Sequence, residues 1–153
     1  MFIYNKIINL MITKKRWMLY QGAGLVILTK SKNNQWHVLL GKRIHNPGKH
    51  KWSFIGGQSQ YDRKLKFAGI CFKHYIEPRI DTCLREATEE INLWTDANWP
   101  NQQEIHYLCS YPWGWSNFLW IAKNDELYVP TVSFPPEFSE IKWFNINELP
   151  DML

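Results

Sequence analysis

Three glutamates between residues 86 and 90 are the part of this sequence best suited to chemistry. Glu86, Glu89 and Glu90 stand at positions i, i+3 and i+4, so on an α-helix their side chains share one face, within an arc of about 100°. Such like-charged pairs cost roughly 0.2–0.5 kcal/mol each. A cluster of oxygen donors alone suits a hard cation such as Mg²⁺ or Mn²⁺, and the alternative is an acidic, solvated helix face.

The helix that must carry these carboxylates is predicted over residues 78–92, with Pro78 in its first turn, where a fixed φ is favourable. Five residues fall on an arc beside the glutamates and are the predicted buried side: Ile80, Cys83, Leu84, Ala87 and Ile91. The acidic face and the apolar face of this helix are therefore neighbours.

Strands are predicted on both sides of the helix in the chain. The apolar runs that indicate them, separated by turn residues, cover residues 22–29, 36–42, 52–55, 104–111, 115–122 and 141–144, with a helical turn from 147. A chain of 153 residues with 45% hydrophobic and 16% aromatic content suits one ordered domain. We therefore expect a single α/β domain over residues 1–153.

The glutamates also stand in a longer pattern. Glu77 is followed after seven residues by Arg85-Glu86-Ala87-Thr88-Glu89-Glu90-Ile91-Asn92-Leu93, and Gly56-Gly57 stands upstream, after Trp52. This pattern resembles the box of the Nudix hydrolases, which reads Gly, five residues, Glu, seven residues, then Arg-Glu-aliphatic-x-Glu-Glu-x-Gly-aliphatic. The resemblance covers about residues 22–150. It implies the Nudix fold, a mixed β-sheet sandwiched between helices.

Two departures from the box carry expectations of their own. Residues 58–76, 19 in number, stand where the pattern has five, so we expect an insertion that leaves the surface beside the site and returns Gly57 and Glu77 close together. Its basic residues, Arg63, Lys64, Lys66 and Lys73, would meet an anionic substrate, or form an ordinary solvated loop. Asn92 replaces the pattern's Gly, and Asn is the next-best residue for a left-handed helix cap.

The ends of the chain also differ from the family pattern. Residues 1–15 form a predicted N-terminal extension, and the chain stops at Leu153, before the longer C-terminal helix that family members usually carry. One face of the sheet is therefore expected to be less covered. Either the extension or a partner subunit, as in a homodimer, would cover it.

The resemblance implies hydrolysis of a nucleoside diphosphate linked to another moiety, such as a nucleotide sugar, a dinucleoside polyphosphate or an NTP. The implied cofactor is Mg²⁺ or Mn²⁺, held by Glu86, Glu89, Glu90 and the carbonyl of Gly56. The implied catalytic residues are Glu86, Glu89, Arg85 and Glu77, of which Arg85 orients carboxylates and Glu77 organises the entry of the helix. The proton of the attacking water goes to a glutamate of the box or to one on a distant loop, with Glu126, Glu137 and Glu140 as candidates.

Aromatic and basic residues are the candidates for substrate binding. Tyr111, Trp113 and Trp115 form either a clamp for a base or an aromatic strand end packed in the core. Arg43 belongs to a basic stretch that would attract polyphosphate or would simply be solvated. A nucleotide-type small molecule is the favoured partner, and nucleic acid is the less favoured one.

Two other functions compete with the small-molecule hydrolase. An RNA-end pyrophosphohydrolase would need a continuous basic surface leading to the site. A Nudix-like regulatory module without catalysis would typically lack a box carboxylate, and none is missing here. Three cysteines without a CxxC pair and the absence of an apolar run of 18 residues favour a reducing cytoplasm and argue against a disulfide framework, a structural zinc site and a membrane span.

Overall fold

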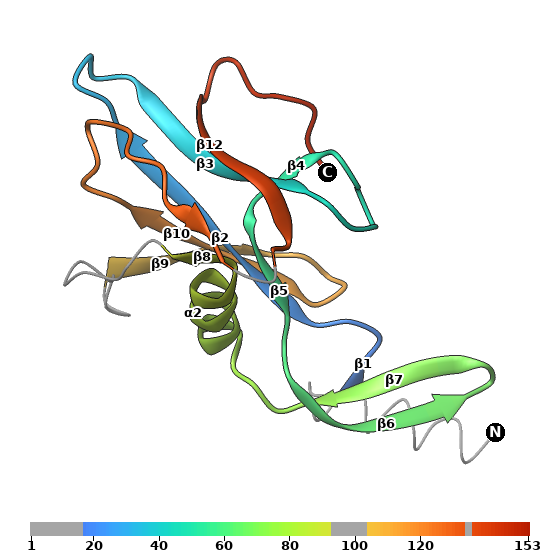
Figure 1. Ribbon diagram of the computed structural model, residues 1–153. Coiled ribbons are helices and arrows are strands. Elements are labelled where there is room, and N and C mark those ends of the chain that lie inside the picture. The colour runs from blue at the N-terminus through green and yellow to red at the C-terminus, as the bar shows by residue number, and fades with distance from the viewer. Residues whose placement is uncertain (1–16, 93–103, 134–135) are drawn as a thin grey trace.

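The computed structural model of the chain describes residues 17–92, 104–133 and 136–153. Its main sheet has the strand order β12-β3-β2-β10-β9, and β4 and β5 add to β3 and β2 (Figure 1). These strands are β2 (Gly22–Lys30), β3 (Trp36–Arg43), β4 (Trp52–Ser53), β5 (Ile55–Gln58), β9 (Ile105–Ser110), β10 (Trp115–Ile121) and β12 (Phe138–Asn145). The predicted strands are confirmed, whereas the extension 1–15 and Leu93 lie outside the described residues.

The sheet is mixed because β2 has neighbours of both directions. It runs parallel to β10 and antiparallel to β3 and β5. A parallel pair in the middle of a sheet is usually buried on both faces, and the first six residues of β2 are all buried. The mixed sheet expected from the sequence is therefore confirmed.

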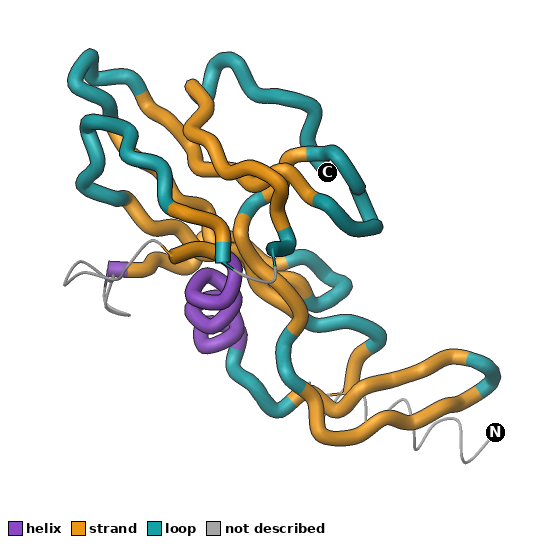
Figure 2. Tube along the Cα trace, in the orientation of Figure 1, coloured by secondary structure: helices purple, strands orange, loops and turns teal. Residues whose placement is uncertain are grey.

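The helix α2 (Arg79–Glu90) covers one face of the main sheet (Figure 2). Cys83, Ala87 and Ile91 are fully buried there, and Ile80 and Leu84 pack against the same core, as the sequence predicted. Their partners on the sheet are mainly Ala23, Leu25, Ile27, Leu39, Phe118 and Trp120. Burial of this apolar stripe fixes the rotation of α2, and with it the direction of the acidic face.

The opposite face of the sheet has a smaller core. Val26, Val38 and Leu40 are buried there against Trp52 of β4 and Met152 near the chain end. Met152 bridges to Trp52 in register, and the Leu153 N–H donates to the Trp52 carbonyl. Before this contact, the chain makes a turn at 145–148, where the Glu148 N–H donates to the Asn145 carbonyl, and then crosses this face.

Residues 61–75 form a long hairpin outside the main sheet (Figure 1). Its strands, β6 (Tyr61–Phe67) and β7 (Ile70–Tyr75), pair with each other, and β7 also pairs with β1 (Trp17–Met18). Ala68 and Gly69 join the strands with φ values of 48° and 80°, as a two-residue hairpin turn of the primed type requires. At the base, the Ile76 N–H donates to the Gln60 carbonyl over 3.1 Å, so the chain returns to where it left the main sheet.

The end of α2 differs from the sequence expectation. A left-handed cap at Asn92 is wrong, because Ile91 caps the helix in an extended conformation, with φ −135° and ψ 135°. Ile91 and Asn92 form the short strand β8 (Ile91–Asn92), which pairs with β11 (Thr131–Val132). The strand pairing holds the chain extended, so the position does not need the left-handed conformation that Gly favours.

The three cysteines are free thiols, and burial raises the pKa of Cys83 to about 12. Among the residues described, no helix has the length and apolar character needed to cross a membrane.

Candidate active site

Arg85 stands at the centre of the acidic face of α2. Its guanidinium donates to Glu86 Oε1 over 2.6 Å, to Glu89 Oε2 over 2.8 Å and to both oxygens of Glu77 over 2.8 and 3.0 Å. A further bond reaches the carbonyl of Gln58 over 3.0 Å. These contacts hold three carboxylates and the start of the hairpin around one cation. The structure thus brings together four of the predicted site residues.

Glu77 lies eight residues before Arg85, yet the two side chains meet directly. Glu77 Oε2 also accepts bonds from the backbone N–H of Gln60 over 2.9 Å and from the Thr82 hydroxyl over 2.8 Å. Burial acts to raise the pKa of Glu77, but the bonds from Arg85, Gln60 and Thr82 outweigh it, so the pKa lies below its ordinary value. Glu77 therefore ties the base of the hairpin to the helix.

Replacing Glu77 by Gln is expected to destabilise the fold by about 1.5–3 kcal/mol, the usual worth of a hydrogen bond to a charged group. Because the pKa of Glu77 is lowered on folding, its contribution is present above the ordinary value of 4.5 and is lost as the pH falls below it. Wild-type stability should therefore fall more steeply than that of Glu77→Gln on acidification from pH 5 to 3. Urea titrations at several pH values measure this, and parallel pH curves would contradict the role.

Glu90 is the most buried carboxylate of the site, with 3% of its surface exposed. Its Oε2 accepts the backbone N–H of Gly56 over 2.8 Å, whereas Oε1 is buried without a hydrogen-bond donor in the described part of the chain. Burial raises its pKa to about 9, despite the Gly56 bond, and the neighbouring Glu137 and Glu86 act in the same direction. A buried oxygen without a partner is costly and needs an explanation.

A fifth carboxylate joins the cluster from a distant part of the chain. Glu137, exposed just before β12, raises the pKa of Glu90 and also contributes to the raised pKa of Glu86, whose main cause is burial. Of the other two distant candidates, Glu126 pairs with Lys32 over 2.6 Å, and Glu140 is exposed within β12. Only Glu137 of the three therefore has an electrostatic link to the box carboxylates.

The donor set suits a divalent cation in kind. The buried Glu90 oxygen lacks a donor, and neighbouring carboxylates add to the raised pKa values of Glu86 and Glu90, an effect that a nearby cation would reverse. Within the described ranges, however, no three acidic, His or Cys side chains converge as a ready metal site. Arg85 holds Glu86 and Glu89 instead, so a cation would bind Glu90 first and compete with Arg85 for the other carboxylates.

The two glycines before the hairpin permit two different close approaches. Gly56 has φ +149°, and a Cβ there would overlap the carbonyl of Ala23 on β2. A Cβ at Gly57 would overlap the carboxylate of Glu86. Gly56 therefore serves the backbone pairing of β5 with β2, and Gly57 makes room for the Glu86 carboxylate.

Gly57→Ala is expected to lower turnover by about 10- to 100-fold, because misplacement of a reacting group by about 1 Å can cost that much. The overlapping atom is the far end of a flexible side chain, so Glu86 moves and the fold survives. Gly69→Ala, at a hairpin position with φ +80° and nothing within 4 Å, is the matched control and should keep its kcat. Wild-type kcat in Gly57→Ala would show that the position of Glu86 is not critical.

The three predicted substrate-binding aromatics do not form one clamp. Tyr111 and Trp113 stack on each other, with ring centroids 4.9 Å apart and planes 7° apart, and both are exposed. Trp115 instead stacks with Tyr20 at 6.0 Å and 10°. Tyr111 and Trp113 are therefore an open aromatic surface at the β9–β10 turn and not a packed strand end.

Tyr20 lies close to the carboxylate cluster, and the sequence did not predict it as a neighbour of the site. Burial raises the pKa of its hydroxyl, Tyr75 and Glu86 raise it further, and Arg43 opposes them. The hydroxyl therefore interacts electrostatically with both the carboxylate cluster and the predicted basic residue Arg43. The Nε of Arg43 donates to the Pro47 carbonyl over 2.9 Å. The only sequence signal is an aromatic residue directly before a strand, which is common.

Gly22 and Gly24 of β2 explain where the Trp115 indole lies. A Cβ at either position would press on that ring, and the indole N–H donates to Asn117 Oδ1 over 2.8 Å. The ring therefore lies flat over β2, on the face of the sheet that carries Val26 and Leu119 and away from α2. A ligand that touches both Trp115 and the carboxylates has to pass around the start of β2.

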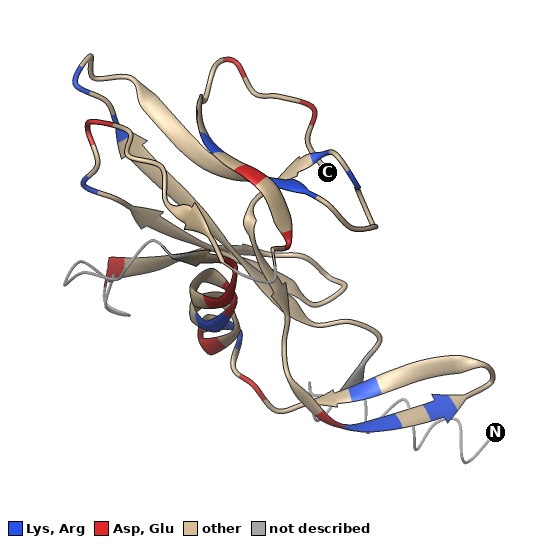
Figure 3. Cartoon of the chain, in the orientation of Figure 1, with Lys and Arg blue, Asp and Glu red and all other residues tan. Residues whose placement is uncertain are grey.

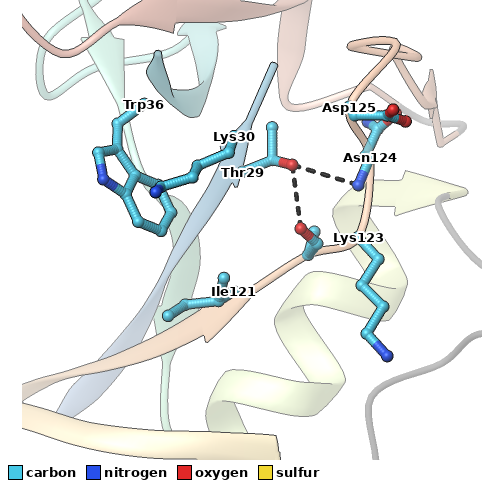
Figure 4. A pocket seen from close by; sticks show the side chains of 8 residues that line it. Thr29, Lys30, Trp36, Ile121, Lys123, Asn124 and Asp125 are labelled. Carbon is cyan, nitrogen blue, oxygen red and sulfur yellow. Dashed lines mark hydrogen bonds between the residues drawn. The ribbon is translucent and has the colours of Figure 1, made fainter. Parts of the chain in front are cut away.

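A cavity of about 290 Å³ lies elsewhere, at the far end of β2, and its lining includes Thr29, Lys30, Trp36 and Ile121 (Figure 4). The Thr29 hydroxyl there donates to the Ala122 carbonyl and accepts the Asn124 N–H. Lys30 lies over the Trp36 ring at 5.0 Å. With these groups already engaged and no box residue in the lining, this cavity is separate from the carboxylate cluster.

Comparisons with known proteins agree with this geometry. No curated protein matches the chain. Among solved structures, a MutT/nudix family protein from Enterococcus faecalis is similar at TM-score 0.57 and 22% identity, over 82% of this chain and 43% of the other. The Ap4A hydrolase of C. elegans in a binary complex is similar at TM-score 0.52 and 22% identity, over 84% of this chain and 81% of the other. The NUDIX domain of Shewanella oneidensis NrtR, complexed with ADP ribose, is similar at TM-score 0.55 and 18% identity, over 84% of this chain and 73% of the other.

At these identities the structural likeness concerns the fold, and this chain spans less than half of the Enterococcus faecalis protein. The model of the NUDIX domain, however, matches residues 18–153. That match includes α2, the double glycine and every carboxylate of the cluster, so the chain belongs to the Nudix hydrolase family.

Proposed function

We propose that this protein hydrolyses the phosphoric anhydride bond of a nucleoside diphosphate linked to another moiety, with the help of a divalent cation. The observation that carries the proposal is Glu90: a buried carboxylate with one oxygen on the Gly56 N–H and the other without a donor. Glu86 and the Arg85-bound Glu89 stand on the same helix. The Ap4A hydrolase and the ADP ribose complex among the similar structures support a nucleotide-type substrate.

The cation, Mg²⁺ or Mn²⁺, would be held by Glu90 and Glu86, with Glu89 and the Gly56 carbonyl as further donors. When bound, it supplies positive charge for phosphate oxygens that become more negative during hydrolysis. Carboxylate and carbonyl oxygens are the donors that both ions accept. The raised pKa values of Glu86 and Glu90 fit side chains whose charged forms a bound cation would stabilise.

The chain's own residues supply position and a proton acceptor. Arg85, held by both oxygens of Glu77, fixes the carboxylates of Glu86 and Glu89. Water attacks one phosphorus, the bond from that phosphorus to the bridging oxygen breaks, and a nearby carboxylate takes the water proton. We assign that last role to Glu89 or to Glu137, because both are exposed whereas Glu90 is buried.

The substrate's remaining parts would bind at the start of β2 and at the β9–β10 turn. The exposed Tyr111–Trp113 stack offers a flat surface to a base. Tyr20 and Trp115 offer a second one, and Arg43 a positive charge close to Tyr20. The three free thiols support a reducing compartment, and we propose a cytoplasmic location.

A screen of nucleoside diphosphate derivatives tests the proposal. Nucleotide sugars, ADP-ribose, dinucleoside polyphosphates and nucleoside triphosphates are incubated with the protein and Mg²⁺ or Mn²⁺, and phosphate is measured with and without a coupled phosphatase. At least one class should be hydrolysed at an anhydride bond. Tight binding of these compounds without hydrolysis of any would instead assign the chain to the regulatory, non-catalytic alternative.

A further inference from the structure

The β6–β7 hairpin carries three lysines on one face. Lys64 and Lys73 are directly opposite each other across the two strands, and Lys66 follows Lys64 by two residues, which returns it to the same face. We call Lys64, Lys66 and Lys73 the lysine face. Figure 3 shows Lys and Arg residues along the hairpin, which projects from the main sheet.

Among the residues that the structure describes, no acidic side chain neutralises the lysine face. Asp62, the hairpin's single acid, bonds to His74 over 2.7 Å and lies 3.5 Å from Arg63, and these two are cross-strand partners on the other face. In the described parts of the chain, none of the three lysines forms an ion pair. Tyr61 holds two of them together, since the amines of Lys64 and Lys73 lie 5.2 and 4.5 Å from the centre of its ring.

This arrangement has a cost that needs a reason. Like charges directly opposite each other destabilise a strand pair. Lysines on an edge strand commonly prevent unwanted pairing, and that would account for Lys64 and Lys66 on β6. It does not account for Lys73, because β7 is the central strand of its sheet, between β1 and β6. Lys73 is held by Gln58 and by the Tyr61 ring, and a negatively charged ligand would offset the charge of all three lysines.

The lysine face leads to the carboxylate cluster through Gln58. The Lys73 amine donates to Gln58 Oε1 over 3.0 Å, and the Gln58 carbonyl accepts Arg85 over 3.0 Å. Gln58 also pairs in register with Gly22, whose N–H donates to the carbonyl of Gly114. The turn that bears the Tyr111–Trp113 stack therefore lies beside the base of the hairpin.

The length of this surface favours a chain-like ligand. Lys66 lies eight residues after Gln58, which sets an upper limit of about 26 Å on the distance, because β5 ends at Gln58 and β6 begins only at Tyr61. Roughly seven stacked nucleotides span that distance at 3.4 Å each, so one mononucleotide bound at the carboxylates cannot reach Lys66. Positive charge along the path, with an exposed aromatic stack at its base, is the combination that single-stranded nucleic acids bind.

We propose that the lysine face binds the phosphate backbone of single-stranded nucleic acid whose end enters the carboxylate site. The strand would run from Gln58 along the hairpin, and its terminal bases would stack on Tyr111 and Trp113. The entry of the strand end rests on the proposed function. The backbone contact with the lysine face does not, because it needs neither a cation nor turnover.

Fluorescence anisotropy with a single-stranded RNA of about 12 nucleotides, bearing a 5′-triphosphate, tests this in EDTA between about 50 and 300 mM NaCl. Lys64→Gln/Lys66→Gln should weaken binding by roughly 10- to 100-fold at 50 mM salt, and lower the slope of log K against log salt by about 1.4, since each single-strand phosphate contact contributes about 0.7. Lys123→Gln/Lys142→Gln removes the same charge from two exposed lysines elsewhere and should bind like wild type.

Three outcomes would overturn the proposal. RNA affinity could fall equally in both double variants, or RNA could bind no more tightly than ADP. Linear polyphosphate of the same charge could also compete as well as RNA, which would make the ligand a polyphosphate. Glu90→Gln separates the two proposals. This variant should bind the RNA like wild type if the lysine face is the binding surface. Wild-type hydrolysis by the same variant would count against the proposed function alone.

Discussion

Chelation with EDTA is expected to abolish hydrolysis by the wild-type protein, and added Mg²⁺ or Mn²⁺ is expected to restore it. Glu86, Glu89 and Glu90 share the face of one helix, and Arg85 is the cation that contacts Glu86 and Glu89. The free oxygen of Glu90 is buried beyond any donor in the described structure. Without a second cation, nothing in the cluster offsets charge that builds on the phosphate oxygens.

The same titration has a readout that does not depend on a substrate. A ligand that binds the folded state alone stabilises it by about 2.7 kcal/mol at 100 times its Kd, so Mg²⁺ or Mn²⁺ should raise the Tm of EDTA-treated protein. NaCl at matched ionic strength is the control. Full hydrolysis in EDTA would refute the cation assignment, and an unchanged Tm would show that the carboxylates do not bind these ions in the free protein.

The helix and the main sheet were accessible to sequence reasoning because their signals are local and repeated. The spacing of Cys83, Ala87 and Ile91 predicts the buried side of α2, and all three are buried. Once that stripe is fixed, Glu86, Glu89 and Glu90 have no freedom to leave the neighbouring arc. The double glycine is likewise local, since each glycine makes room for a defined neighbour.

The hairpin and the far members of the site were not predictable in the same way. The turn at Ala68–Gly69 lacks the Asn-Gly or Asp-Gly signal of a primed turn, so residues 58–76 were expected only as a surface excursion. Tyr20 and Glu137 reach the cluster through tertiary packing, which leaves no spacing to detect. The expected cap at Asn92 failed for a related reason, because pairing of β8 with β11 overrides a local preference.

Glu90→Gln is expected to lower turnover by on the order of 10²-fold or more, the scale found when one electrostatic stabiliser is removed. Stability in EDTA should be unchanged or slightly higher. The amide oxygen can still accept the Gly56 N–H, and the new NH₂ group removes repulsion with Glu86 and Glu137. Glu89→Gln should also lower turnover, but its effect on stability in EDTA should be smaller, because Glu89 is exposed. Steady-state kinetics and urea unfolding measure both effects.

The pH dependence gives this prediction its sharpest form. The folded-state pKa of Glu90 is raised from 4.5 to about 9, chiefly by burial, so without metal the folded state holds a proton that the unfolded state releases. Stability of the wild type in EDTA should therefore fall as the pH rises from about 4.5 towards 9. Glu90→Gln should lose that slope, and Glu140→Gln, at an exposed position of β12, should keep it.

Comparison with Glu77→Gln separates the two roles within the cluster. In the described structure Glu77 bonds to Arg85, Thr82 and the Gln60 N–H, so its loss should weaken stability more and turnover less than the loss of Glu90. The pH slopes should also be opposite, since the pKa of Glu77 is lowered and that of Glu90 raised. A folded Glu77→Gln as inactive as Glu90→Gln at saturating Mg²⁺ would place Glu77 among the groups that touch the cation or the substrate. A Glu90 variant that unfolds readily yet keeps its kcat would make Glu90 a structural residue.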